Sequence, residues 1–252
     1  MTRLIKLAAA GLLGGLAVSA LAGCYASVSV GPLQHRTSSY SVPGQVRTLV
    51  VHGQAGDVDV TGTSAGVARV TDHLTFRHTV PVTSRRVSAG TLTLDTSCPA
   101  LETCTVSYNI AVPQATIVRI HDGAGTIRLD GLSGPVTAST NAGDIDLSSV
   151  SGPIEATDHA GSVLGRDLSA VHATLHVSAG KIDATFSAAP AAITASADVG
   201  SIALHVPGNL SYDVAASASV GSVRVGVIVN RKSAHTITAT DQTGSITIEP
   251  AA

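Results

Sequence analysis

The segment Ala142-Gly143-Asp144-Ile145-Asp146-Leu147 decides the fold of this chain, because its pattern recurs through the C-terminal half. In each copy a glycine is followed by a polar residue, and small or aliphatic residues stand two and four positions after the glycine. The glycines recur every 18 to 23 residues, at Gly125, Gly143, Gly161, Gly180, Gly200, Gly221 and Gly244. A period of about 20 residues is typical of repeat proteins in which each unit packs only against its neighbours.

The repeat also fixes which side chains face inward. Slots seven and five residues before the glycine are small or aliphatic in nearly every copy, and Asp144 and Ser201 occupy the polar slot after it. Such alternation predicts two half-buried strands per repeat, joined at a glycine that can adopt positive φ. We therefore predict an all-β fold: a β-solenoid, like a parallel β-helix, with Ile145 and Ile202 in its core.

Residues 46–115 match the repeat only in part. The segment Gly56-Asp57-Val58-Asp59-Val60 fits on both sides of its glycine, whereas Gly90-Thr91-Leu92-Thr93-Leu94 fits only downstream. We interpret residues 46–115 as antiparallel β-hairpins that cap the solenoid, because an open solenoid end needs protection from solvent. The solenoid repeats are then expected over residues 116–250.

The N-terminus carries the features of an export signal. Arg3 and Lys6 precede an apolar run, Leu7–Ala22, that is short for a membrane-spanning helix. This order predicts a secretory signal peptide over residues 1–23, with an uncleaved anchor helix as the alternative. The ending Leu21-Ala22-Gly23-Cys24 resembles the bacterial lipobox, and that resemblance implies cleavage before Cys24 and lipid attachment to it.

Residues 24–45 are rich in Ser, Gly and Pro, which predicts a flexible tether between the lipid anchor and the folded region. The two remaining cysteines, Cys98 and Cys104, are separated by five residues. In an oxidising compartment such a pair predicts a disulfide. A metal site would need further ligands, and neither cysteine belongs to a CxxC motif.

Composition limits the partners. The chain of 252 residues has a formal net charge of −2, and loss of the signal peptide would make it about −4. No basic stripe remains, so we expect no electrostatic binding to nucleic acid. The chain has no Trp and only six Phe and Tyr residues in all.

The sequence offers few candidates for chemistry. Asp57/Asp59 and Asp144/Asp146 could bind Ca²⁺ or act as acid and base, but they also fit a solubilising polar ladder. His172 and His176 lie about 13 Å apart on an extended strand, too far to share one ion. A stacked site from His121-Asp122 and Asp158-His159 competes with solvated bend residues. We expect no metal and no cofactor.

Enzymatic activity is not expected. The chain lacks a GxSxG motif. Arg119 and Arg128 look isolated, and Phe76, Phe186 and Tyr212 are scattered, which is unlike the clustered charges and aromatic platforms of polysaccharide-acting β-helix enzymes. We therefore assign no catalytic residue.

The units Ala142–Leu147 and Gly244-Ser245-Ile246-Thr247-Ile248 look like those of the bacterial "putative adhesin" β-strand-repeat family, a family of unknown function related to head-GIN adhesin-like domains. The resemblance covers residues 46–250 and transfers no catalytic residue. It implies a role at the cell surface or in the envelope, without a defined ligand.

Three functions remain open. The first is a non-enzymatic protein, exported and anchored in the membrane through Cys24, whose repeat surface binds or scaffolds an envelope protein or glycan. The second is a sensory or regulatory module of the envelope. The third is a polysaccharide-acting β-helix enzyme.

Overall fold

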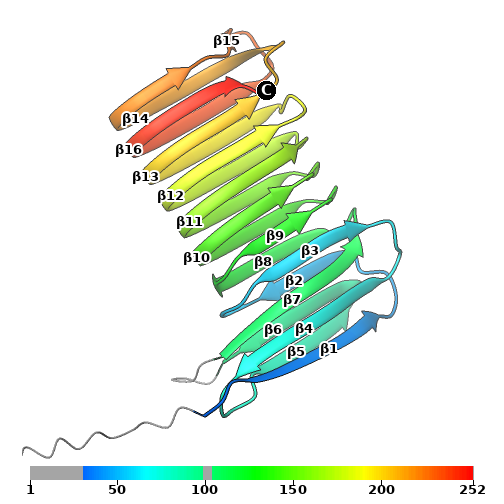
Figure 1. The fold of residues 1–252 in the computed structure, drawn as a ribbon. Coiled ribbons are helices and arrows are strands. Elements are labelled where there is room, and N and C mark those ends of the chain that lie inside the picture. Colours follow the sequence, from blue (N-terminus) through cyan, green and yellow to red (C-terminus); the bar gives the residue numbers. More distant parts are fainter. Residues whose placement is uncertain (1–30, 99–103, 252) are drawn as a thin grey trace, which may run out of the picture. The chain divides into compact units, whose positions relative to one another are not determined.

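The computed structural model describes residues 31–98 and 104–251 and consists of β-strands (Figure 1). The strands of the N-terminal part are β1 (Gln34–Val42), β2 (Thr48–His52), β3 (Val58–Thr63), β4 (Ala68–Phe76), β5 (Val82–Ser88), β6 (Thr91–Ser97) and β7 (Cys104–Pro113). Those of the repeat region are β8 (Ile117–Ala124), β9 (Ile127–Asp130), β10 (Val136–Ser148), β11 (Ile154–Leu168), β12 (His172–Phe186), β13 (Ala192–Val206), β14 (Ser211–Val225), β15 (Ile228–Val229) and β16 (Thr236–Pro250).

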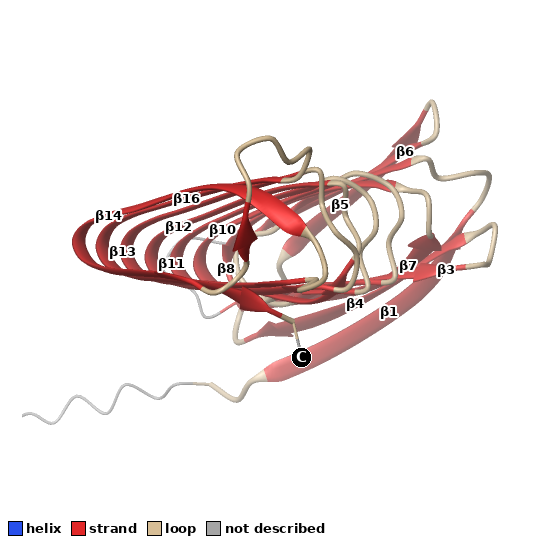
Figure 2. Cartoon of the chain, turned by 90° about the horizontal axis from the view of Figure 1, so that it is seen from above, coloured by secondary structure: helices blue, strands red, loops and turns tan. Residues whose placement is uncertain are grey.

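The predicted β-solenoid is confirmed. The long strands bend at the glycine that recurs in each repeat, so that each strand contributes one half to each of two facing layers (Figure 2). Successive rungs pair in parallel and in repeat register, apart from a shift between Gly165 and Leu168 where β11 meets β12. Ile145 of β10 accordingly lies beside Ile127 of β9 and Val163 of β11. Ile145 and Ile202 are buried, as the repeat phase predicts.

The glycine at each bend is required by the stacking. From Gly125 to Gly244 these glycines have φ between 139° and 154°, a region that other residues rarely adopt. A Cβ at Gly143 would also collide with the carbonyl oxygen of Gly125 on the preceding rung. The spacing seen in the sequence therefore reflects a column of glycines along one side of the solenoid.

The rungs follow chain order except at the C-terminal end. β16 lies between β13 and β14, and β14 is the last full rung (Figure 1). The connection after β14 is the longest between repeats, and β15 within it pairs with the start of β14. This length lets the chain return past β14 before it adds the inserted rung.

The N-terminal region corrects two predictions. Parallel stacking begins at β2 and β3, which pair with β8 and β9, so residues 46–115 are only partly antiparallel. Antiparallel pairing is found for β1 with β4, β4 with β7, and β5 with β6. The tether predicted over residues 24–45 is wrong for Gln34–Val42, which forms β1; residues 24–30 lie outside the described part.

The pattern of the segment that begins at Gly90 predicts the layer formed by the strand halves after each glycine. In the structure this segment lies in the opposite layer, with the halves before each glycine. Leu92 and Leu94 stack beside Leu49 and Val51, which occupy the slots before a glycine and not those after it. β6 and β7 thus form the two halves of a rung, because β7 in turn lies beside β3.

A disulfide between Cys98 and Cys104 closes the connection from β6 to β7, with 5.8 Å between the two Cα atoms. This connection takes the place of the glycine bend of the later rungs. The backbone N–H of Cys98 also donates to the side-chain oxygen of Gln54, at 2.6 Å.

Among the residues described, no helix has the length and hydropathy needed to span a membrane.

Candidate binding cleft

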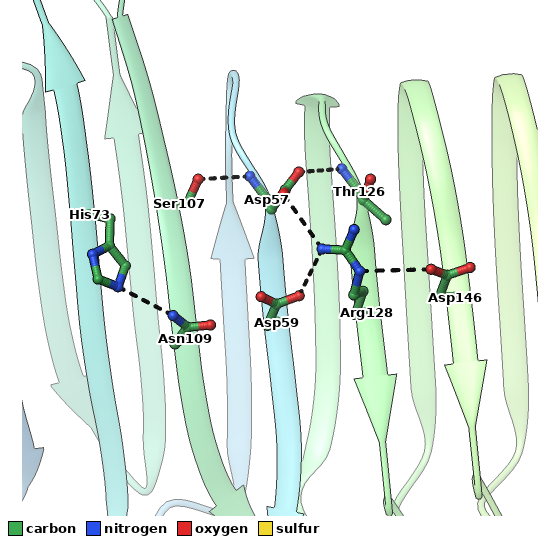
Figure 3. A network of polar contacts seen from close by, with 8 residues as sticks. All are labelled: Asp57, Asp59, His73, Ser107, Asn109, Thr126, Arg128 and Asp146. Carbon is green, nitrogen blue, oxygen red and sulfur yellow. Dashed lines mark hydrogen bonds and ion pairs between the residues drawn. The ribbon is translucent and has the colours of Figure 1, made fainter.

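A polar network covers the outer face of the layer that contains β3, β9 and β10 (Figure 3). One guanidinium nitrogen of Arg128 lies 3.2 Å from Asp59 and 3.4 Å from Asp57, and another lies 3.8 Å from Asp146. The sequence context of Arg128 indicates an isolated residue, but in the structure Arg128 lies among three acidic residues. Arg128 offsets part of the negative charge of the three carboxylates and holds them through its own ion pairs, an arrangement that supports the solubilising ladder and disfavours a Ca²⁺ site.

The acidic residues after the bend glycines also tie neighbouring rungs together. Asp57 accepts a hydrogen bond from the backbone N–H of Thr126, at 3.0 Å, and Asp144 accepts one from Ser162, at 2.9 Å. Both contacts join one rung to the next. These side chains thus have a structural role in addition to providing surface charge.

Three other acidic residues lie inside the bends. Asp122, Asp158 and Asp241 each stand three residues before a bend glycine and are buried. Asp158 accepts a hydrogen bond from the N–H of Ala160, but its second oxygen has no partner among the described residues. Burial raises the pKa of all three carboxyls, that of Asp122 to about 6.

The stacked site of His121-Asp122 and Asp158-His159 does not form. The two aspartates point into the core, which also corrects their interpretation as solvated bend residues, whereas the histidines are exposed. His121 bonds to the hydroxyl of Ser139, at 2.9 Å, and His159 to the carbonyl oxygen of Thr140, at 3.3 Å. Within residues 31–98 and 104–251 no group of His, Cys, Asp and Glu has metal-site geometry.

A different group of side chains converges at the N-terminal end, between β1, β4 and β7 of one layer and β5 of the other. They line a cleft of about 200 Å³, and its walls are Ser38, Tyr40, Asp72, Thr83, Ser84, Arg85 and Tyr108. The Arg85 guanidinium lies over the Tyr40 ring, 4.2 Å from its centre, in a cation–π contact that connects the two layers.

Two groups in this cleft are buried, and each has a polar atom without a hydrogen-bond partner among the described residues. Asp72 is 8% exposed and Tyr108 is 2% exposed. One carboxylate oxygen of Asp72 and the hydroxyl of Tyr108 find no hydrogen-bond partner among the described residues. Burial is the main cause that raises the pKa of Tyr108 to about 12, so its phenol is neutral at physiological pH. The nearby Thr96 hydroxyl lowers this pKa in part, but it lies outside hydrogen-bond geometry to Tyr108 and donates to the His52 carbonyl, at 3.0 Å. Buried polar groups are rarely left unpaired, and such a pair in a cleft indicates a place for a ligand.

Sequence reasoning missed this cleft. Tyr40 falls in the segment interpreted as a tether, and Asp72 and Tyr108 lie in strands whose pairing the repeat does not specify. A signal was present: Asp72 stands at an inward position between Val70 and Leu74, where an apolar residue is expected.

One further cluster, on the outer face beside the cleft, contains serine, aspartate and histidine. One carboxylate oxygen of Asp95 accepts a hydrogen bond from the Ser84 hydroxyl, at 3.1 Å. The other is hydrogen-bonded to Nδ1 of His52, at 2.7 Å. The hydrogen bond from His52 is the main cause that lowers the pKa of Asp95. Because the aspartate stands between the other two, the histidine cannot accept the serine proton as it does in a catalytic triad.

Of the other residues singled out in the sequence, Cys24 lies outside the described part, so its lipidation remains a prediction. His176 bonds to the hydroxyl of Ser196, at 2.9 Å.

Comparison with curated proteins finds no significant match. A family profile described as Toastrack DUF4097 matches residues 38–249.

Several solved structures are similar to this chain. A "putative adhesin" from Bacteroides fragilis is 18% identical, with a TM-score of 0.49, and the match covers 86% of this chain and 97% of the other. A "putative cell adhesion protein" from Clostridium sporogenes is 14% identical, with a TM-score of 0.37 and coverages of 87% and 100%. A "putative lipid binding protein" from Parabacteroides distasonis is 11% identical, with a TM-score of 0.38 and coverages of 84% and 96%.

Proposed function

This chain belongs to the Toastrack DUF4097 family, and we propose that it is a non-enzymatic, lipid-anchored binding protein of the cell envelope. The cleft between β1 and β5 is its binding site, and the solenoid is the scaffold that carries this site. The observation that carries the proposal is that Asp72 and Tyr108 line the cleft while one carboxylate oxygen of Asp72 and the hydroxyl of Tyr108 are buried without a hydrogen-bond partner.

Export and anchoring are supported by two independent features. The N-terminal charge and hydropathy pattern, together with Leu21-Ala22-Gly23-Cys24, is that of a lipoprotein signal. The disulfide between Cys98 and Cys104 is a type of bond that persists in oxidising compartments. Two or more acyl chains on Cys24 would provide a stable anchor.

The groups in the cleft are suited to a hydroxylated ligand such as a single sugar unit. Asp72 offers an acceptor, Arg85 offers donors, and the Tyr108 hydroxyl can do either. A sugar hydroxyl donates and accepts at once, so it can satisfy all three. A volume of about 200 Å³ is below that of most drug-sized sites, which favours one sugar ring or the end of a glycan chain.

A binding role also fits the surrounding chemistry better than catalysis does. The arginine of the cleft is engaged with Tyr40, and the neutral phenol of Tyr108 is a poor base. Asp95 lies between Ser84 and His52 in the neighbouring cluster, so the histidine does not reach the serine and cannot act as its general base. These features support recognition without a chemical step.

The proposal is tested by titration calorimetry on the full chain in detergent, with glucose, galactose and N-acetylglucosamine as probes. Asp72→Ala and Tyr108→Phe should each weaken binding of the preferred sugar at least tenfold, since each removes the group that pairs with a sugar hydroxyl. Tyr212→Phe is the matched control, because Tyr212 is buried at the other end of the solenoid, where its hydroxyl donates to the Pro207 carbonyl. Absence of binding by all three sugars, or an equal loss in the control, would contradict the proposal.

A further inference from the structure

A row of polar side chains crosses five neighbouring strands on the outer face of the layer that contains β5, β6, β2, β8 and β10. In that order the strands contribute Ser84, Asp95, His52, His121 and Ser139, each the register partner of the next. His52 and His121 stand at the centre of the row, on parallel strands that lie side by side (Figure 1). Since neighbouring strands are about 4.8 Å apart, the two imidazoles are adjacent.

A carboxylate fixes the tautomer of His52. Nδ1 of His52 lies 2.7 Å from one oxygen of Asp95. An ionised carboxylate can only accept, so Nδ1 carries the proton and Nε2 of the neutral ring keeps a lone pair. Histidines that bind metal ions commonly donate from their other ring nitrogen to a carboxylate, which orients the ring and makes it more basic.

A serine does the same for His121. Nδ1 of His121 lies 2.9 Å from the hydroxyl oxygen of Ser139, and that hydroxyl donates to the carbonyl oxygen of Ile120, at 3.4 Å. A hydroxyl has one hydrogen to donate, so Ser139 accepts from Nδ1 of His121. Nε2 of His121 therefore also keeps a lone pair when the ring is neutral.

The hydrogen bonds turn the two Nε2 atoms toward each other. Asp95 lies on β6, on the far side of β2 from β8, and Ser139 lies on β10, on the far side of β8 from β2. The Nδ1 atoms thus point away from each other, and Nε2 lies on the opposite side of an imidazole ring from Nδ1. Among residues 31–98 and 104–251, neither Nε2 atom has a hydrogen-bond partner.

We propose that His52 and His121 bind one divalent transition-metal ion through their Nε2 atoms, with Cu²⁺ held more tightly than Zn²⁺. Imidazole nitrogens suit both ions, and affinities of such sites usually follow that order. The described residues contain no group of three or more His, Cys, Asp and Glu side chains arranged for a metal, so solvent supplies the other ligands.

The surroundings of the pair leave room for the ion and its water ligands. The His52 side chain is 55% exposed, so an ion reaches it from solvent. Beside the two histidines is a hollow of about 190 Å³, whose walls include Val50, Arg119 and Thr137. Because β2 and β8 are far apart in the chain, no spacing motif marks the pair, and the sequence alone predicts no metal.

The chain provides its own control for a histidine that has no histidine beside it. His176 occupies on β12 the slot that His121 occupies on β8, and its Nδ1 lies 2.9 Å from the hydroxyl of Ser196. Its register partner on β11 is Thr157, which cannot act as a second imidazole ligand. A solubilising role is common to His121 and His176, whereas a metal site requires the pair.

The test titrates Cu²⁺, and separately Zn²⁺, into the full chain in detergent, in a buffer that does not bind metals and at a pH above the ordinary pKa of histidine. Loss of a residue that only orients a ligand costs about 10- to 100-fold in metal affinity, and loss of the ligand should cost at least as much. His52→Gln and His121→Gln should therefore each weaken the tightest Cu²⁺ site at least tenfold, and His176→Gln should leave it unchanged.

Two further measurements separate a metal site from a structural effect. Electron paramagnetic resonance of bound Cu²⁺ should show coupling to two imidazole nitrogens in the wild-type chain and lose one in either variant. Zn²⁺ should raise the urea midpoint of the wild-type and His176→Gln chains but not that of His52→Gln, since an ion that binds the folded state stabilises it. Melts without metal show that each variant folds.

Asp95→Asn tests the orientation of His52. The amide of asparagine can donate to Nδ1 and so favours the tautomer with its proton on Nε2, which cannot bind a metal; Cu²⁺ affinity should fall about 10- to 100-fold. Unchanged Cu²⁺ affinity in Asp95→Asn would overturn the positioning role of Asp95. A tightest Cu²⁺ site that survives either His52→Gln or His121→Gln, or that His176→Gln weakens equally, would overturn the proposal.

Discussion

The carboxylate of Asp144 accepts a hydrogen bond from the backbone N–H of Ser162, one rung further along the solenoid, at 2.9 Å. Replacing Asp144 by Ala should therefore lower the free energy of unfolding by about 1 kcal/mol, the usual contribution of one such bond. Lys181→Ala is the control, because Lys181 occupies the same slot on β12 with an exposed side chain, and its loss should cost about 0.5 kcal/mol or less. Urea melts compare the two; equal effects would show that the contact between rungs does not stabilise the fold.

Asp122 should make the protein less stable as pH rises. Its pKa is about 6 in the folded chain, above the ordinary value of 3.8, so folding favours the protonated form. The contribution of Asp122 to the free energy of unfolding is fully present below about pH 3.8. It is lost as pH rises through about 6, by up to about 3 kcal/mol.

Asp122→Asn should reduce the dependence of stability on pH between pH 4 and pH 7, leaving the part due to Asp158 and Asp241, whose pKa values are also raised. Asp130→Asn, which alters an exposed carboxylate, should retain the full dependence. Denaturant melts across the range provide the measurement, and an unchanged dependence in Asp122→Asn would assign the effect to other groups.

The disulfide between Cys98 and Cys104 should stabilise the connection from β6 to β7. Replacing both cysteines by serine should cost about 2 kcal/mol, a modest value because the closed loop is short. Thermal unfolding of the double variant, compared with that of the disulfide-bonded wild-type chain, gives the value, and the reduced wild-type chain should match the variant. Two thiols that react with an alkylating reagent in the exported, unreduced protein would show that the bond does not form in the cell.

Cys24→Ser should abolish lipid attachment. Without the thiol, the precursor should remain uncleaved or the chain should be released from the membrane, since the proposed lipoprotein signal would direct both steps to that residue. Radiolabelled fatty acid, followed by membrane fractionation, reports both steps. Normal labelling of the variant would place the anchor elsewhere.

Much of the fold could be predicted because the repeat imposes it residue by residue. The glycine column and the buried positions of Ile145 and Ile202 follow from spacing alone, since each rung repeats the constraints of the one before. The position of β16 between β13 and β14 could not be read in this way. Nearly identical rungs can pair in more than one order. Only the long connection after β14 indicates that β16, and not β14, lies next to β13.

The candidate site was less predictable, because it lies where the repeat ends. Tyr40, Asp72 and Tyr108 come from three strands that meet through antiparallel pairing, and Arg85 faces them from β5 in the other layer. The clusters that the sequence did suggest, such as His121 with Asp122, fail because strand alternation sends the two neighbours to opposite faces.

The central claim, that the cleft between β1 and β5 binds a sugar, is tested most directly by NMR of the ring-labelled tyrosines. The chain has four tyrosines, of which Tyr40 and Tyr108 line the cleft and Tyr212 lies at the opposite end of the solenoid. Addition of the sugar that binds in calorimetry should shift the ring signals of Tyr40 and Tyr108 and leave that of Tyr212 unchanged. Binding that leaves the signals of Tyr40 and Tyr108 unshifted would place the site elsewhere and contradict the account.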